Sequence, residues 1–152
     1  MSNKKDSIII LLAEDDEDDY LLIEKSLKKA KILNKIKWVK DGVELMDYLK
    51  HRGEYKDVFK SPKPHLILLD LNMPRKDGRE SLKDIKSDPA LKNIPVIVLT
   101  TSKSEEDIFS SYNLGVNSFI RKPTKFDDFV KAIQLISQYW FELVELPIEE
   151  KF

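Results

Sequence analysis

The sequence predicts an α/β domain in which a doubly wound, five-stranded parallel sheet is covered by helices on both faces. Five apolar runs alternate with segments of helical spacing. Three of these runs are short, nearly unbroken and rich in Ile, Leu or Val, a pattern typical of parallel strands buried on both faces. Successive parallel strands need crossover helices, and the alternation provides them. A length of 152 residues suits one such domain.

The five apolar runs predict the strands in chain order. SIIILLA at 7–13 and IKWV at 36–39 are the first two. HLILL at 65–69, PVIVLT at 95–100 and NSFI at 117–120 complete the set. The nearly unbroken apolar character of the first, third and fourth runs fits strands that are buried on both faces.

Helical spacing of apolar residues marks the segments between and after the strands. These segments lie at 21–30, 43–49, 82–89, 104 onward and about 125–144. Asp88-Pro89 ends the third segment. The fourth begins with Ser104, a capping residue, and with acidic residues that the helix dipole favours in a first turn. The stretch at 51–64 contains two prolines and no clear period, so a long loop is expected there.

Charge and composition argue against several classes of protein. The 26 basic and 27 acidic side chains nearly cancel, which gives no support to a nucleic-acid or anionic-membrane surface. The absence of cysteine excludes disulfides and thiol catalysis. The first residues imitate a signal peptide, but the acidic run EDDEDD follows directly, without a cleavage site. No segment approaches the roughly 20 apolar residues of a membrane span, so a soluble, cytoplasmic domain is expected.

Polar side chains follow four of the predicted strands at the point where each strand ends. Glu14 and Asp15 follow the first, Asp70 follows the third, Thr100 closes the fourth, and Lys122 comes just after the fifth. Ligands of open α/β sheets bind beyond the carboxyl ends of the strands. If the central strands are adjacent, these side chains converge on one site.

This combination of side chains indicates a metal-assisted phosphoryl site. Clustered carboxylates resist joint ionisation, and a hard divalent cation such as Mg²⁺ would relieve that repulsion. A lysine in the same place would pair with a phosphoryl oxygen. An aspartate beside the metal can itself be the nucleophile and form an aspartyl phosphate.

Four motifs in register resemble the receiver domain of two-component response regulators. They are LLAEDDEDD, LILLDLNMPRKDG, VIVLTTS and FIRKP. The resemblance covers about residues 7–144 and implies a flavodoxin-like strand order. It makes residues 1–152 a single receiver domain with a short C-terminal extension at 145–152.

The resemblance implies a role for each matching residue. Asp70 would accept a phosphoryl group from a sensor histidine kinase. Asp15 would bind Mg²⁺ directly and Glu14 through water, and the backbone carbonyl of Asn72 would complete the metal site. The protein would be a signalling module, not a metabolic enzyme, that catalyses its own phosphotransfer and slow dephosphorylation.

Three further residues match the positions that read the phosphoryl group. Thr100 matches the hydroxyl that moves toward it, and Lys122 matches the cation that pairs with it. Phe119 matches the aromatic residue that changes rotamer on activation, although plain core packing explains it equally well. Thr101 stands where receivers usually have a small residue, and its size would narrow access to the phosphoryl group.

Simpler interpretations exist for several of these residues. Asp70 alone would be read as a turn-forming aspartate. The acidic residues after the first strand suit the first turn of a helix, and Asp16 to Asp19 are expected to serve mostly that purpose. Trp38 is expected to be ordinary strand packing.

Other functions were weighed against the same residues. A phosphohydrolase with an aspartyl phosphate intermediate would carry a second aspartate where Asn72 stands. A transcription factor would need a DNA-binding domain, and too little sequence follows residue 144. A receiver-like module without phosphorylation is disfavoured because all five residues of the motif are present: Glu14, Asp15, Asp70, Thr100 and Lys122.

The long loop and the final segment, ISQYWFELVELP, narrow the resemblance to the small regulators paired with bacterial phytochromes in cyanobacteria. The implied partner is a sensor histidine kinase, either a phytochrome or another sensor. Three consecutive aromatic residues on one helix cannot all face the core, because successive residues lie about 100° apart. We therefore expect a homodimer that uses this helix end. The interface candidates are Tyr139, Trp140, Phe141 and Leu143.

Overall fold

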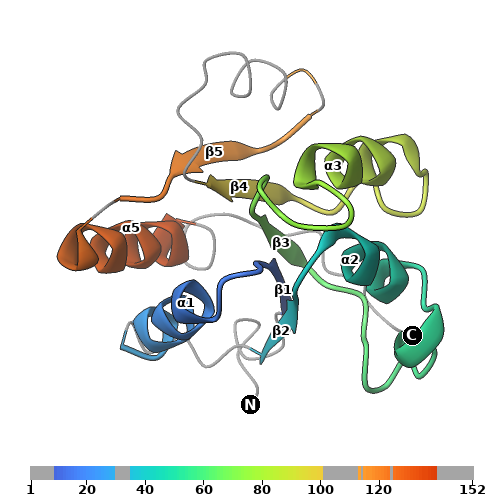
Figure 1. Cartoon of the computed structure of the whole chain (residues 1–152), viewed down its shortest axis with the longest axis horizontal. Helices are drawn as coiled ribbons and strands as arrows, with labels where there is room; N and C mark the ends of the chain where they lie inside the picture. The colour runs from blue at the N-terminus through green and yellow to red at the C-terminus, as the bar shows by residue number, and fades with distance from the viewer. Residues whose placement is uncertain (1–8, 30–34, 101–112, 114, 124, 140–152) are drawn as a thin grey trace.

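A computed structural model describes residues 9–29, 35–100, 113, 115–123 and 125–139. Its five strands form one parallel sheet in the order β2-β1-β3-β4-β5 (Figure 1). The strands are β1 (Ile9–Ala13), β2 (Lys35–Val39), β3 (Leu66–Leu69), β4 (Val96–Thr100) and β5 (Ser118–Arg121). This arrangement confirms the predicted fold class and the flavodoxin-like strand order.

Four helices are described. They are α1 (Glu17–Lys29), α2 (Gly42–Leu49), α3 (Gly78–Ser87) and α5 (Phe126–Gln138). The predicted fourth helical segment, from residue 104, lies outside the described residues except for the helical Asn113, and the predicted end of the last helix beyond residue 139 also lies outside them. α3 begins four residues before Leu82, because the side chain of Asp77 accepts a hydrogen bond from the backbone N–H of Arg79 and starts the helix there.

The stretch at 51–64 is more ordered than a plain loop. A short 3₁₀ helix, η2, spans Gly53–Tyr55. The hydroxyl of Tyr48 donates to the carbonyl of Pro62 at 2.8 Å, and a ring nitrogen of His51 lies 2.9 Å from the carbonyl of Ser61. These two side chains of the α2 region hold the far end of the stretch against the domain.

The core has two layers, one on each face of the sheet. Successive side chains of a strand point to opposite faces. Leu11 and Leu69 therefore pack toward α2 and α3, while Leu12 and Leu68 pack toward α1 and α5. Figure 1 shows the two helix pairs on opposite sides of the sheet, which confirms the predicted helices on both faces.

The parallel strands bring their carboxyl ends to one edge of the sheet. β1 pairs with β3 through Ala13 and Leu69, and β4 pairs with β5 through Thr100 and Arg121. The residues that follow these strand ends are therefore neighbours in space although they are distant in sequence.

None of the helices in the described part of the chain has the length and apolar character of a membrane span.

Candidate functional site

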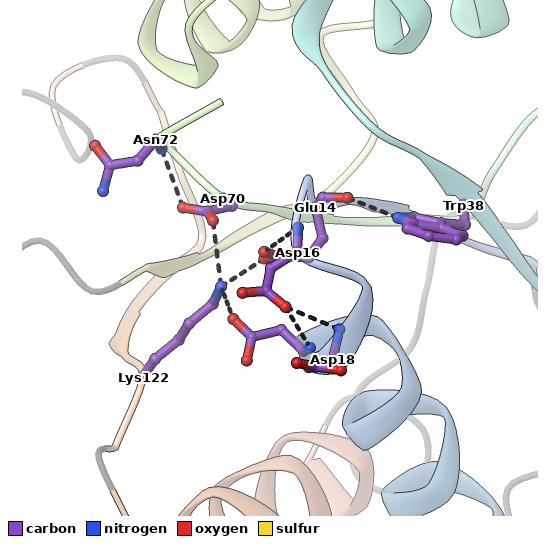
Figure 2. Close-up of polar contacts among 8 residues, drawn as sticks. Glu14, Asp16, Asp18, Trp38, Asp70, Asn72 and Lys122 are labelled. Carbon is purple, nitrogen blue, oxygen red and sulfur yellow. Dashed lines mark hydrogen bonds and ion pairs between the residues drawn. The ribbon is translucent and has the colours of Figure 1, made fainter. Parts of the chain in front are cut away.

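Asp70 is fixed at the end of the central strand β3. Its backbone N–H donates to the carbonyl of Ala13 at 3.0 Å, which continues the pairing with β1 by one residue. Its Oδ1 accepts a hydrogen bond of 3.0 Å from the backbone N–H of Asn72, as Figure 2 shows. The residue is only 6% exposed. Asp70 is therefore a buried carboxylate held by backbone contacts, and its other oxygen, Oδ2, points toward Lys122.

The start of α3 packs directly on the backbone of Asp70. A Cβ atom at Gly78 would lie 2.3 Å from the carbonyl oxygen of Asp70 and 2.7 Å from Cα of Leu71. The backbone N–H of Gly78 donates to the carbonyl of Leu71 at 3.0 Å. The chain therefore needs glycine here, because any side chain would push the helix away from the strand end.

The turn after β1 places a second buried carboxylate beside Asp70. The backbone N–H of Glu14 donates to the carbonyl of Val39 at 3.0 Å, and Oε1 of Glu14 accepts from the backbone N–H of Asp16 at 3.1 Å. Asp16 Oδ1 in turn accepts from the backbone N–H groups of Asp18 and Asp19. Asp16 thus starts α1, which agrees with the helix-start role expected for it.

Lys122 joins three carboxylates from three parts of the chain (Figure 2). Its Nζ lies 2.5 Å from Glu14, 2.9 Å from Asp19 and 3.2 Å from Asp70. The side chain of Lys122 is 4% exposed, and those of Glu14 and Asp70 are 2% and 7% exposed. The predicted convergence of strand ends is therefore present, and Asp19 adds a member that the sequence interpretation had assigned mostly to the helix start.

The site holds more negative charge than one lysine compensates. Burial, and then the neighbouring Asp70 carboxylate, raise the pKa of Glu14 to about 8, while Lys122 acts in the opposite direction. Burial alone would lower the pKa of Lys122, but Asp70 and Glu14 outweigh it and hold this pKa above its usual value. Lys122 is therefore a permanent cation, and crowded carboxylates surround it.

The same carboxylates suit a divalent cation. Glu14, Asp15 and Asp70 each offer an oxygen atom, and these atoms all lie within 4.8 Å of one another. Asp15 is exposed, whereas the other two are buried. An all-oxygen set with one exposed member matches the preference of Mg²⁺ and Mn²⁺ for oxygen ligands.

The remaining predicted site residues are described in part. Thr100 is the last residue of β4 and lies beside Arg121 of β5, but its side chain is outside the described structure, as is all of Thr101. Phe119 is half-buried and packs against the core layer under α2 and α3. Tyr139 is 54% exposed at the end of α5. Trp140, Phe141 and Leu143 lie outside the described residues.

Comparison with known families finds one match that covers most of the chain. The model of the response regulator receiver domain matches residues 10–134. This range contains every strand end that contributes to the site.

Individual proteins and solved structures agree with this match. Response regulator Rcp1 of Synechocystis sp. is 46% identical over 126 residues, which cover 83% of this chain and 84% of that protein. The crystal structure of the phosphorylated cyanobacterial phytochrome response regulator RcpA is 44% identical, with a TM-score of 0.88, and the alignment covers 93% of this chain and 99% of that one. The Mn²⁺-bound form of Rcp1 is 45% identical, with a TM-score of 0.87 and the same coverage.

Proposed function

Because this chain belongs to the response regulator receiver family and is a phosphoryl acceptor of two-component signalling, we propose that Asp70 is the residue that accepts the phosphoryl group. One observation carries the assignment: Oδ2 of Asp70 lies 3.2 Å from the buried ammonium of Lys122. A phosphoryl group on that oxygen would lie beside a buried cation. Asp70 also sits at the end of the central strand, where the backbone fixes its position.

The proposed reaction moves a phosphoryl group from nitrogen to oxygen. The phosphorus–nitrogen bond of a phosphohistidine breaks, its electron pair stays with the imidazole, and an oxygen of Asp70 forms the new bond to phosphorus. Lys122 offsets the charge that gathers on the phosphoryl oxygens. Water later attacks the phosphorus atom, the bond from phosphorus to the oxygen of Asp70 breaks, and inorganic phosphate leaves, which restores the carboxylate. In this proposal the receiver catalyses its own phosphorylation and dephosphorylation, and these two reactions switch a signal on and off.

The proposed cofactor is Mg²⁺. Asp15, Asp70 and the backbone carbonyl of Asn72 would hold it, with Glu14 acting through water. When bound, the ion supplies positive charge next to the phosphoryl oxygens. The carboxylates within 4.8 Å of one another support this assignment.

The proposed switch couples the phosphoryl group to the surface around β4 and β5. Thr100 would turn its hydroxyl toward the new phosphoryl oxygens, with Thr101 limiting access beside it. Phe119 would then adopt a new rotamer, since it stands on the neighbouring strand and is only half-buried. A phosphoryl group adds roughly −1.5 to −2 charges at one point, which is enough to bias such a two-state element.

The central assignment is tested with acetyl phosphate, Mg²⁺ and intact mass measurement. The unmodified protein should gain one phosphoryl group, and Asp70→Asn should gain none. Asp57→Asn is the matched control, because Asp57 is an exposed carboxylate on the loop between α2 and β3. A full phosphoryl signal in Asp70→Asn would overturn the assignment. Loss of the phosphoryl signal in both Asp70→Asn and Asp57→Asn would show that this signal is not specific to phosphorylation of Asp70.

The proposed partner of this cytoplasmic protein is a sensor histidine kinase of the phytochrome or another photosensor class. RcpA is a cyanobacterial phytochrome response regulator, and it covers nearly the whole chain at 44% identity. We assign residues 1–152 to a single receiver domain that receives its phosphoryl group from this kinase. Phosphotransfer from a purified, autophosphorylated phytochrome kinase, faster than from an unrelated kinase, would support the partner class.

The proposed assembly is a homodimer through the outer face of α5. Leu135 and Tyr139 lie four residues apart, so they share one face of the helix, and they are 66% and 54% exposed. Trp140, Phe141 and Leu143 would extend this surface. Sedimentation velocity should show a dimer at micromolar concentration and a monomer for Leu135→Glu. A monomer in the unmodified protein, before and after phosphorylation, would remove the dimer.

A further inference from the structure

The ammonium group of Lys122 has no donor in reserve. An ammonium offers three N–H donors. Glu14, Asp19 and Asp70 each accept from Lys122, and the contact to Asp70 is the longest of the three. Any new acceptor near Asp70 must therefore share Lys122 with carboxylates that already bind it.

Asp19 competes with the phosphoryl group for Lys122, and it does not belong to the proposed metal site. The carboxylates that could hold a metal are Glu14, Asp15 and Asp70. A bound divalent cation would draw the charge of Glu14 to itself and weaken its claim on Lys122. Asp19 would then remain as the main rival of the phosphoryl group for the ammonium.

The helix start does not account for the contact of Asp19. Glu17, Asp18 and Asp19 all lie in the first turn of α1, where the helix dipole favours acidic residues. Asp19 alone among these three contacts Lys122 in the described structure. Its side chain is 30% exposed, so water can solvate the carboxylate when Lys122 turns away.

We propose that Asp19 is a releasable counter-ion that holds Lys122 back from the phosphoryl position and so sets how tightly the site binds the phosphoryl group. Before phosphorylation, Asp19 occupies one donor of Lys122 and draws the ammonium toward α1. When the phosphoryl group arrives, its oxygens compete for that donor, and Asp19 returns to water. This inference rests on the proposed function, because it takes Asp70 as the acceptor and Lys122 as the partner of the phosphoryl group.

The test compares Asp19→Asn with Asp18→Asn. Both variants remove one negative charge from the first turn of the same helix, but only the first removes a contact to Lys122. Beryllofluoride, a stable mimic of the phosphoryl group, is titrated at saturating Mg²⁺ and followed by fluorine NMR. Free Mn²⁺ is followed by electron paramagnetic resonance to measure the affinity of the metal site separately.

We expect Asp19→Asn to bind beryllofluoride roughly two- to fivefold more tightly than the unmodified protein, the range of a partly exposed ion pair. Asp18→Asn should match the unmodified protein, and Mn²⁺ affinity should be nearly the same in all three. Weaker binding by Asp19→Asn, or equal binding by the two variants, would overturn the inference while leaving Asp70 as the acceptor. If the unmodified protein binds no beryllofluoride, the proposed function fails, and this inference fails with it.

Discussion

The indole N–H of Trp38 donates a hydrogen bond of 2.6 Å to the backbone carbonyl of Glu14. The indole ring also stacks on Tyr20 of α1, with centroids 4.1 Å apart and planes within 4° of each other. Trp38, on the edge strand β2, therefore restrains the turn that carries the acidic residues of the proposed metal site. Trp38 is more than the ordinary strand packing that the sequence had suggested.

Trp38→Phe should weaken divalent metal binding. Phenylalanine keeps an aromatic ring for Tyr20 but removes the N–H donor, so the turn at Glu14 loses one restraint. The loss of one hydrogen bond corresponds to about two- to tenfold in affinity. Titration with Mn²⁺ measures it, with Tyr20→Phe as the control that keeps the stacked ring. Identical affinities for Trp38→Phe and the unmodified protein would show that the turn holds without this bond.

Asp15→Ala should raise the Mg²⁺ concentration needed for half-maximal phosphorylation more than Glu14→Gln does. Asp15 is exposed at the open side of the site and is the proposed direct ligand. Glu14 already accepts hydrogen bonds from Lys122 and from the backbone N–H of Asp16, so we expect it to contribute less to metal binding than Asp15 does. Initial rates with acetyl phosphate across a Mg²⁺ series measure the difference. Small and equal effects of the two variants would contradict the assigned roles.

Lys122→Arg should not behave as a conservative change. The guanidinium is larger and planar, whereas the three carboxylates within 3.2 Å surround a compact charge. We expect the aspartyl phosphate still to form, while the change of surface around β4 and β5 is lost. Hydrogen exchange with and without beryllofluoride measures that change. An exchange pattern in Lys122→Arg like that of the unmodified protein would contradict this prediction.

The Asp41–Arg75 pair should make stability depend on pH in the acid range. Oδ2 of Asp41 accepts a hydrogen bond of 2.8 Å from Nε of Arg75, and Oδ1 caps α2 by accepting from the backbone N–H of Glu44. Burial alone would raise the pKa of Asp41, but these hydrogen bonds outweigh it and lower this pKa below its ordinary value of 3.8. The folded protein therefore binds this proton less readily than the unfolded chain. The stabilisation is complete above about pH 4 and is lost as the pH falls below it.

Asp41→Asn separates this charge effect from the cap. Asparagine is also a good capping residue, so the variant loses the ion pair and keeps most of the helix start. It should be less stable than the unmodified protein at pH 7, and the gap should close below pH 4. Urea unfolding at a series of pH values measures it. A gap that stays constant down to pH 3 would show that Asp41 acts only through the cap.

The parts of the site that follow from local sequence were predictable. An apolar run that ends in Asp70 identifies a strand end, and FIRKP places Lys122 at another, because each signal is complete within a few residues. The parallel arrangement then brings these ends together without further information. The family resemblance supplied the roles that local pattern leaves open.

The role of Asp19 was not predictable in this way. Its position in a helix start already explains an acidic residue, so nothing local marks it as different from Asp18. Its contact with Lys122 joins residues 103 positions apart and depends on how the first turn of α1 meets the residue that follows β5. Trp38 poses the same difficulty, because its hydrogen bond depends on the register of β1 against β2. Such contacts appear only once the strands are placed.

The contact between Glu14 and Lys122 spans 108 positions of the sequence. A nascent chain that has left the ribosome as far as Asp70 carries every proposed carboxylate of the metal site but lacks their lysine. Its carboxylates then repel one another without a counter-ion, and the phosphoryl group has no cation to meet. By the proposed assignment, the site is therefore complete only once Lys122, which follows β5, has been synthesised.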